Sequence, residues 1–371
     1  MKFSRVATPL VALSLPLAAA PALAGTEYTT SSGGTFTFYG QLDPAIISFD
    51  DGVNTDTDLA DNAKSNSRFG FWIRQPFGEN ELRFQFETAL GFRPSSALGQ
   101  TSTPDAWEWD KTRLRRVDLS VRTASYGTFY LGQGSMASDG AGSNDLSGTG
   151  VVSDVGIGDY VASRFLRDSS GALSSVLMGD AFNNYDGTRR GRIRYDTPMF
   201  GNFTVGLAYG RNILNASDDS EYYDVALNYQ NTLADETKVA AGIGYMVTNT
   251  EVGPNVKDTF GSVSVLLKTG WNVTLTAGSR DPDGGFYMAK FGYLTDKWVG
   301  WGQTAVSVDY YHSEDMASIG GGADSYGVAI VQNVDQYDLQ MYLGYRSYSY
   351  EDSATGYKDP SSLVTGVKWT F

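Results

Sequence analysis

Arginines occupy alternate positions in several short segments of this 371-residue sequence. In the segment 192–195, two arginines alternate with Ile193 and Tyr195. A period of two places the two sets on opposite faces of a β-strand. We therefore predict strands with one apolar face and one basic face that needs water or counter-charges, because neighbouring like charges repel. By this parity the basic face carries Arg68, Arg74, Arg83, Arg116, Arg122, Arg190, Arg192 and Arg194.

Aspartates gather in the long segment 136–187, which follows the fifth predicted strand. Loops longer than ~15 residues without regular structure are usually functional. Acids that face arginines across a narrow, water-filled gap create a transverse electric field, which orients polar solutes. The alternative is a solvated external loop with ordinary surface acids. The acids of interest in this segment are Asp139, Asp145, Asp154 and Asp159.

Covalent and metal chemistry have few candidate residues. The absence of Cys excludes a disulfide scaffold, thiolate chemistry and zinc sites built on sulfur. The single histidine, His312, is followed by Ser313, Glu314 and Asp315, but adjacent strand residues point to opposite faces and do not form a triad. By parity with Tyr310, His312 faces lipid or the outer interface. We predict no enzyme activity and no cofactor, and a hydrolase that uses His312 is the alternative.

The first 24 residues have the organisation of a secretory signal peptide. Lys2 and Arg5 precede an apolar stretch, and the segment ends in a small-x-small cleavage site at 22–24. The stretch is too short and interrupted for a membrane anchor, and no later stretch has the length and apolarity of a membrane-spanning helix. We predict one domain, 25–371. Its formal net charge of −16, against −14 for the whole sequence, argues against a nucleic-acid partner.

Sixteen segments show the period-two pattern of strands, and helical spacing is not sustained after residue 24. The segment 361–371 is the clearest, because Leu363, Val367 and Trp369 alternate with smaller or polar residues. The predicted strands are 35–49, 67–77, 81–93, 112–124, 128–135, 188–196, 202–211, 221–231, 237–248, 257–268, 271–280, 284–294, 301–312, 323–333, 336–350 and 361–371.

The links and the apolar faces favour a transmembrane barrel over a secreted soluble fold. Short links such as 78–80 and 269–270 alternate with longer ones such as 94–111 and 351–360, as in outer-membrane barrels. Side chains alone cannot fill a sixteen-stranded lumen, so a soluble barrel with an apolar interior is excluded. Aromatic residues near strand ends form the expected interfacial belt. They are Trp298, Trp301, Tyr310, Tyr311, Tyr345 and Trp369.

Four short motifs, in this order and spacing, resemble the general porins of Gram-negative bacteria. The segment 38–43 (FYGQLD) is similar to their first strand, and 126–132 (YGTFYLG) to the turn and strand before their constricting loop, with Tyr126 where Phe is usual. The segment 192–198 (RIRYDTP) resembles their signature after that loop. The terminal segment 367–371 (VKWTF) is similar to their last strand and its C-terminal Phe.

The resemblance implies a homotrimeric channel in the bacterial outer membrane, whose third external loop folds into the lumen. This placement would bring the acids of the segment 136–187 opposite the arginines. The expected function is passive diffusion of small hydrophilic solutes and ions, with outer-membrane lipid and lipopolysaccharide as further partners. A substrate-specific channel is an alternative, but it needs a lumenal track of aromatics or bases. The lumenal candidates Tyr39, Tyr130 and Tyr342 fall on strands scattered across the predicted wall, so no track is evident. An outer-membrane hydrolase is the remaining alternative.

A second acidic cluster precedes the second predicted strand. Asp51, Asp56 and Asp58 are candidate calcium ligands, but their spacing lacks the glycine at position six of an EF-hand loop. An acidic, solvated loop that shares divalent ions with lipopolysaccharide is the favoured interpretation, and we assign no metal site. The ion preference stays open, because the net charge favours cations and the arginines favour anions.

Overall fold

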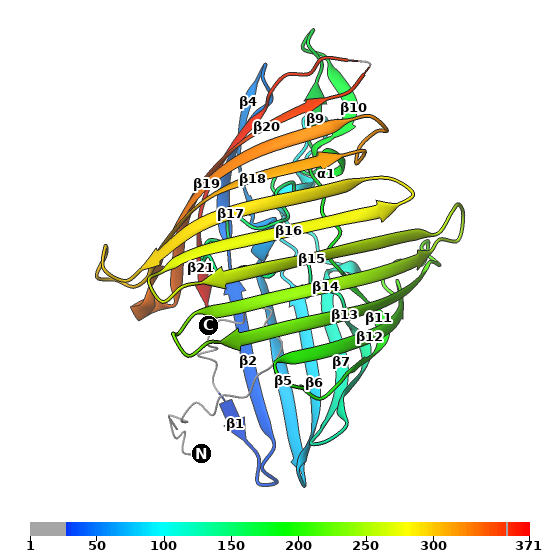
Figure 1. The fold of residues 1–371 in the computed structure, drawn as a ribbon, viewed down its shortest axis with the longest axis vertical. Coiled ribbons are helices and arrows are strands. Elements are labelled where there is room, and N and C mark those ends of the chain that lie inside the picture. Colours follow the sequence, from blue (N-terminus) through cyan, green and yellow to red (C-terminus); the bar gives the residue numbers. More distant parts are fainter. Residues whose placement is uncertain (1–26, 354) are drawn as a thin grey trace.

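The computed structural model describes residues 27–353 and 355–371, and the predicted signal peptide 1–24 lies outside them. Within this range, sixteen antiparallel segments close into one barrel (Figure 1). All sixteen predicted strands are confirmed, most of them to within one to three residues at each end. No helix in the described part of the chain has the length and apolarity to cross a membrane.

Two of the sixteen segments are composite. The first consists of β2 and β3, which meet at Asp43, and the second consists of β4 and β5, separated by the short helix η1 (Ala63–Ser65). The barrel strands are β2 (Thr35–Leu42), β3 (Pro44–Asp50), β4 (Thr55–Asp61), β5 (Arg68–Phe77), β6 (Asn80–Ala89), β7 (Leu114–Thr123), β8 (Gly127–Ser135), β11 (Arg189–Asp196), β12 (Phe203–Arg211), β13 (Glu221–Thr232), β14 (Lys238–Asn249), β15 (Val256–Leu266), β16 (Trp271–Asp281), β17 (Gly285–Thr295), β18 (Thr304–Glu314), β19 (Gly322–Val334), β20 (Leu339–Glu351) and β21 (Ser361–Thr370).

The smaller elements are not part of this ring of strands. The short strand β1 (Glu27–Thr29) pairs with the start of β2. The hairpin β9 (Phe165–Arg167) and β10 (Leu173–Leu177) and the one-turn helix α1 (Met178–Ala181) belong to the segment between β8 and β11. Three short helical turns, η2 (Ser95–Ala97), η3 (Lys111–Arg113) and η4 (Asp335–Tyr337), lie in links between strands.

Closure of the barrel follows from the pairing of its first and last strands. β21 pairs with β3, where Thr365 opposes Ile46, and with β2, where Thr370 opposes Gln41. β8 pairs directly with β11, so the segment 136–188 leaves the wall between two neighbouring strands. We call the barrel end that carries this segment the loop end and the opposite end, which carries the link 78–79, the turn end.

The predicted alternation of link lengths is wrong in two places. The link predicted over 50–66 contains β4, which leaves only the turn 51–54 between β3 and β4. The link 282–284, which joins β16 to β17 at the loop end, is shorter than the link 296–303, which joins β17 to β18 at the turn end. The predicted order of long and short links is therefore reversed here. Link length was therefore a weaker signal than the period-two pattern, which located all sixteen spanning segments but missed β4, the first part of the second segment.

The two faces of the wall differ as the alternation predicts. On β13, Val225 and Leu227 are exposed, whereas Asp224 and Ala226, which alternate with them, are buried. Exposed apolar side chains on the outward face suit contact with lipid. Aromatic rings gather near the turn end of this face, where Trp271 packs 4.6 Å from Tyr293 between ring centroids. The predicted belt residue Tyr311 is an exception, because it is fully buried inside the barrel.

An apolar core lies inside the barrel, between the wall and the segment 136–188. The ring of Phe182, from this segment, packs against Tyr348 of β20 at 4.9 Å and Tyr311 of β18 at 6.2 Å. Ile47 and Phe49 of β3 are buried in the same core. The inner face on this side of the barrel is therefore apolar where it packs against the segment 136–188, in contrast to the basic face of β5, β6, β7 and β11.

Candidate functional site

The structure brings the eight predicted arginines together on the inner face of neighbouring strands, and we call them the arginine wall. They come from β5, β6, β7 and β11, and several of them lie directly opposite other inward-facing residues of the neighbouring strand. Cross-strand pairs include Arg74 with Arg83, Glu87 with Arg116 and Glu81 with Arg122. Because β8 and β11 are paired, the arginines of β11 continue the surface begun by those of β7.

Two arginines of β11 are held by carboxylates on the same wall. Arg192 donates two hydrogen bonds of 2.9 Å to Asp118 of β7, and its side chain is only 1% exposed. Arg194 forms a similar pair with Asp196 at 2.8 and 2.9 Å, and also donates to the carbonyl oxygen of Met136. Bidentate pairs of this kind are strong and directional. They explain how basic residues at alternate positions of one strand are tolerated.

Aromatic rings contact the guanidinium groups of all three predicted arginines of β11. The guanidinium carbon of Arg190 lies 4.0 Å from the ring centroid of Tyr222. Those of Arg192 and Arg194 both lie 5.3 Å from the ring of Tyr130. Distances below about 6 Å are typical of cation–π contacts. The arginines of β11 are therefore oriented groups in fixed positions, and Tyr130, which looked isolated in the sequence, belongs to their support.

The loop end of the wall has more bases than acids. Glu87 accepts a hydrogen bond from Arg115 Nε at 2.6 Å and one from the Tyr39 hydroxyl at 2.9 Å, and its carboxylate lies 3.7 Å from Arg68 Nε. Arg116 donates to the Ser135 hydroxyl at 3.0 Å. The guanidinium groups of Arg68 and Arg115 therefore share the carboxylate of Glu87, and Arg116 lies directly opposite Glu87 in register.

Sequence reasoning missed Arg115, since parity with Arg116 assigns it to the outward face. The register of β6 and β7 shifts between Glu87 and Thr88, which inserts Arg115 as an extra residue and turns it inward. A β-bulge of this kind leaves no trace in the alternation. Arg189 was also missed; its Nε is buried and has no hydrogen-bond partner among the described residues.

Three of the four predicted loop acids pair with lysines, not with the arginine wall. Asp145 lies 2.7 Å from Lys290 of β17, whose side chain is only 1% exposed. Asp154 forms an ion pair with Lys64 of η1, and Asp159 lies 3.9 Å from the same ammonium. The lysines thereby fasten the segment 136–188 to the wall. The roles of these acids at a constriction stay a prediction.

The fourth acid, Asp139, lies near a second carboxylate of the same segment. Asp186 accepts hydrogen bonds from the Gly140 and Gly142 amides at 3.1 Å and from the Ser143 hydroxyl at 2.6 Å. Burial, together with the negative charge of Asp139, raises the pKa of Asp186 to about 6. The charge of this part of the segment therefore changes in the neutral to mildly acidic range.

The three calcium candidates are engaged by arginines. Asp56 and Asp58 accept hydrogen bonds from Arg164 at 2.8 and 3.1 Å, and Asp51 lies 2.7 Å from Arg167. Both arginines belong to the segment 136–188. Among the described residues, no group of three or more His, Asp or Glu side chains is arranged to hold a metal ion. Asp51, Asp56 and Asp58 therefore bind the long segment to the wall at the loop end.

His312 lies on the outward face at the loop end, as parity predicts. Its Nδ1 is 2.9 Å from Asp324 and its Nε2 is 3.3 Å from Glu314. Ser349 lies opposite Asp324 in register, on the side away from His312. The acid therefore separates the serine from the histidine, whereas a hydrolytic triad needs the histidine between the other two.

The comparisons agree with this architecture. Residues 10–353 match the family described as Gram-negative porin. Among solved structures, the anion-selective porin from Comamonas acidovorans is similar at 15% identity, with 91% of this chain and 100% of that chain covered and a TM-score of 0.60. The trimer form of OmpT from Vibrio cholerae is similar at 16% identity, with coverages of 91% and 99% and a TM-score of 0.55.

A third solved structure, the outer membrane channel DcaP of Acinetobacter baumannii, is similar at 11% identity, with 94% and 100% coverage and a TM-score of 0.59. At these identities the likeness concerns the fold. No curated protein sequence matches the chain.

Proposed function

This chain belongs to the family of Gram-negative porins, and we propose that its channel passes small hydrophilic anions in preference to cations. As a porin it lies in the bacterial outer membrane and forms a water-filled channel for passive diffusion of small hydrophilic solutes and ions. The observation that carries the anion preference is the surplus of guanidinium groups around Glu87. Charges within a Debye length of ~8 Å act on a permeating ion, whereas the acids of distant loops are screened.

The segment 136–188 narrows this channel in our proposal. Its apolar core against β18 and β20, and its ion pairs with Lys290 and Lys64, support a fixed position inside the barrel. With that side filled, solutes pass along the arginine wall. Of the four predicted constriction acids, Asp139 is the one without a lysine partner among the described ion pairs. We therefore propose that the carboxylate of Asp139 faces the solute path, whereas that of Asp145 is held by Lys290.

The reversal potential of purified protein in a planar bilayer tests the anion preference. With a salt gradient across the membrane, an anion-selective channel gives a potential whose sign follows the chloride gradient. A potential of the opposite sign overturns the proposed preference without touching the porin assignment. A protein that inserts but gives no stepwise, ohmic conductance overturns the channel function itself.

A substrate-specific anion channel is the second candidate. The specific observation in its favour is the row of arginines that Tyr130 and Tyr222 hold in place, which supplies the track of bases that such a channel needs. Liposome swelling with a series of mono- and dicarboxylates separates the two functions. Flux of one anion that saturates with concentration favours the specific channel, whereas flux proportional to concentration for all of them favours general diffusion.

We propose that the channel is a homotrimer that assembles through a phenylalanine-rich outward surface. Rings on β2, β5 and β6 stack in one patch that reaches the C-terminus; Phe36 and Phe71 are 5.3 Å apart, and Phe38 and Phe371 6.2 Å. The solved structure of OmpT that resembles this chain is a trimer form, which also supports a trimer. Light scattering in detergent tests the state, and Phe71→Lys should yield monomers that still conduct.

We further propose that the protein has no catalytic activity and that the segment 1–24 is removed on export. The arrangement of His312, Asp324 and Ser349 supports the first point. His312→Ala should leave conductance unchanged, and hydrolysis of lipid or peptide substrates by the parent but not by the variant would contradict us. N-terminal sequencing of the protein from outer membranes should begin at Gly25.

A further inference from the structure

A tryptophan, Trp72, stands on the inner face of β5, in the half of the strand nearer the turn end. Its neighbours point outward, because Phe71 belongs to the stacked rings of the phenylalanine-rich surface and Ile73 is exposed. In register, Trp72 opposes the buried side chains of Thr37 on β2 and Gln85 on β6. An indole ring therefore lies on the inner face of the wall, within the row of arginines.

The guanidinium group of Arg74 lies over this indole ring. Its carbon is 5.0 Å from the ring centroid of Trp72, which is within the range of cation–π contacts. Among residues 27–353 and 355–371, the Arg74 side chain has no hydrogen-bond or ion-pair partner. The arginine opposite it in register, Arg83, pairs with Glu81. Arg74 is therefore a cation held by a ring, in contrast with Arg192, which a carboxylate holds.

The ring of Tyr39 extends the aromatic surface toward the loop end. The inward position next to Trp72 is Gly70, where a Cβ atom would lie 2.7 Å from Cζ of Tyr39. The Tyr39 hydroxyl donates to Glu87 at 2.9 Å and accepts from Gln85 at 2.7 Å, which fixes the ring over the glycine. The inner wall therefore offers two aromatic rings and a cation side by side.

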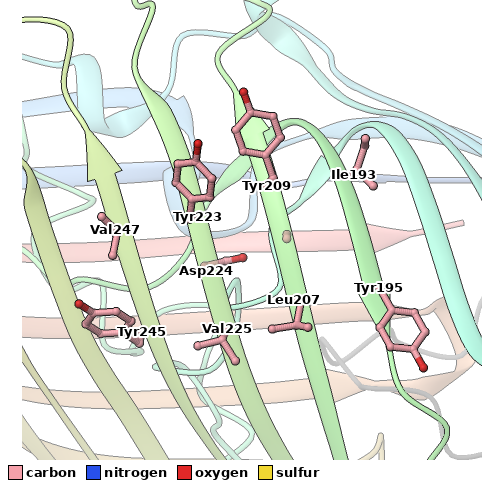
Figure 2. A pocket seen from close by; sticks show the side chains of 10 residues that line it. Ile193, Tyr195, Leu207, Tyr209, Tyr223, Asp224, Val225, Tyr245 and Val247 are labelled. Atoms are coloured by element: carbon pink, nitrogen blue, oxygen red, sulfur yellow. The ribbon is translucent and has the colours of Figure 1, made fainter.

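The row of register through Arg74 ends at the segment 136–188. It runs from Arg74 through Arg83, Ser120, Tyr130 and Arg194 to Asp224. There Asp224 accepts hydrogen bonds of 2.8 and 2.6 Å from the amide and hydroxyl of Ser138. Figure 2 views that part of the wall from outside, across a hollow lined by Leu207 and Val225, and shows Asp224 behind the sheet. Five strands separate Arg74 from this attachment, so solutes of the proposed channel pass the Arg74 end of the row.

We propose that Trp72 and Arg74 form a subsite for small aromatic carboxylates, such as benzoate, in the lumen. The subsite rests on the proposed anion channel and names a class of anion that this wall binds. A halide ion uses only the charge of Arg74, and an aliphatic acid leaves the rings without a partner. An aromatic acid stacks its ring on the indole or the guanidinium plane, while its carboxylate accepts hydrogen bonds from the guanidinium group.

Two acids of similar size and equal charge test the proposal, as blockers of the chloride current through single channels in a planar bilayer. Benzoate has an aromatic ring, and cyclohexanecarboxylate has an aliphatic one. We expect benzoate to block at a concentration about threefold lower, in keeping with the strength of aromatic pairs. Trp72→Leu should remove this difference, whereas Trp271→Leu, at an exposed position on β16, should retain it. Equal block of the parent channel by the two acids would overturn the proposal.

Further variants separate the ring from the cation. Arg74→Gln should weaken the block by both acids, whereas Arg211→Gln, which removes an exposed cation from β12, should not. Block that survives Arg74→Gln unchanged would refute the role of the cation and with it the subsite. Trp72→Phe should keep most of the preference for benzoate. Heat-modifiable gel mobility verifies that each barrel is folded, and Trp72→Met replaces Trp72→Leu if the latter is not.

The reversal potential of the same channels in a chloride gradient keeps the subsite and the anion preference apart. An anion-selective channel that both acids block equally overturns the subsite alone. A cation-selective channel overturns the anion preference, whichever acid blocks it better.

Discussion

The Nε atom of Arg115 lies 2.6 Å from Oε1 of Glu87, although the two residues would face opposite sides of an ideal sheet. The contact exists because β6 and β7 change register between Glu87 and Thr88. It makes Glu87 the shared counter-charge of Arg115 and Arg68 at the loop end of the arginine wall. One carboxylate therefore offsets a large part of the positive charge that a solute meets there.

Replacing this carboxylate should strengthen the anion preference. Glu87→Gln keeps the side-chain shape and an oxygen acceptor for Tyr39, but removes one negative charge from the cluster. We expect the anion-to-cation permeability ratio, obtained from reversal potentials, to rise about twofold or more, because the removed charge lies within the ~8 Å Debye length of the path. Glu221→Gln on the outward face is the control, and an equal change in both variants would contradict the assignment.

The buried pair of Arg192 and Asp118 should matter for stability. Asp118→Ala leaves a guanidinium group that is 1% exposed without its counter-charge, which typically costs about 3–5 kcal/mol. The temperature at which the barrel unfolds, followed by gel mobility, should fall clearly. Lys268→Ala breaks an exposed surface pair with Glu236 and should change the free energy of unfolding by less than about 1 kcal/mol. Similar effects of the two substitutions would refute the prediction.

Loss of the lysine that fastens the long segment should widen the channel. Lys290→Met keeps the length of the side chain but removes its ion pair with Asp145 and its hydrogen bond to the Ser153 carbonyl. Because the Asp145 carboxylate then stays buried without a cation, the segment should leave its position on β17 for part of the time. Single-channel recordings should show higher and noisier conductance, with Lys257→Met as the control. Unchanged conductance would mean that the segment does not narrow the path.

The channel should respond to pH near 6 through Asp186. Burial and the charge of Asp139 raise the pKa of this carboxyl to about 6, above its ordinary value of 3.8. The folded protein thus favours the neutral form. The contribution of Asp186 to the free energy of unfolding is greatest below its ordinary pKa of 3.8. This contribution is lost as the pH rises through about 6, where Asp186 gains a negative charge beside Asp139.

The anion-to-cation permeability ratio should therefore fall between pH 5 and pH 7. Asp186→Asn keeps the side chain neutral and should flatten this change, while the ratio at pH 5 stays close to that of the parent protein. Reversal potentials at a series of pH values provide the measurement. A variant that retains the full pH response would assign it to another group.

The sequence by itself determined the barrel and the identity of its basic face. Strand positions and facing follow from local alternation, because each strand residue must point to one side of the wall or the other. Arg192, Arg194 and the other members of the arginine wall were found in this way without any knowledge of their partners. The same reasoning placed His312 on the outward face.

Only the tertiary structure decided what the long segment does and which charges remain unpaired. The contacts of Asp145 with Lys290 and of Asp56 with Arg164 join residues more than a hundred positions apart, and the segment 136–188 has no period that would orient its side chains. The inward turn of Arg115 depends on a one-residue register shift between two strands. Local alternation sets the face of a residue, whereas its counter-charge depends on how distant segments pack, and this packing decides the net charge along the channel.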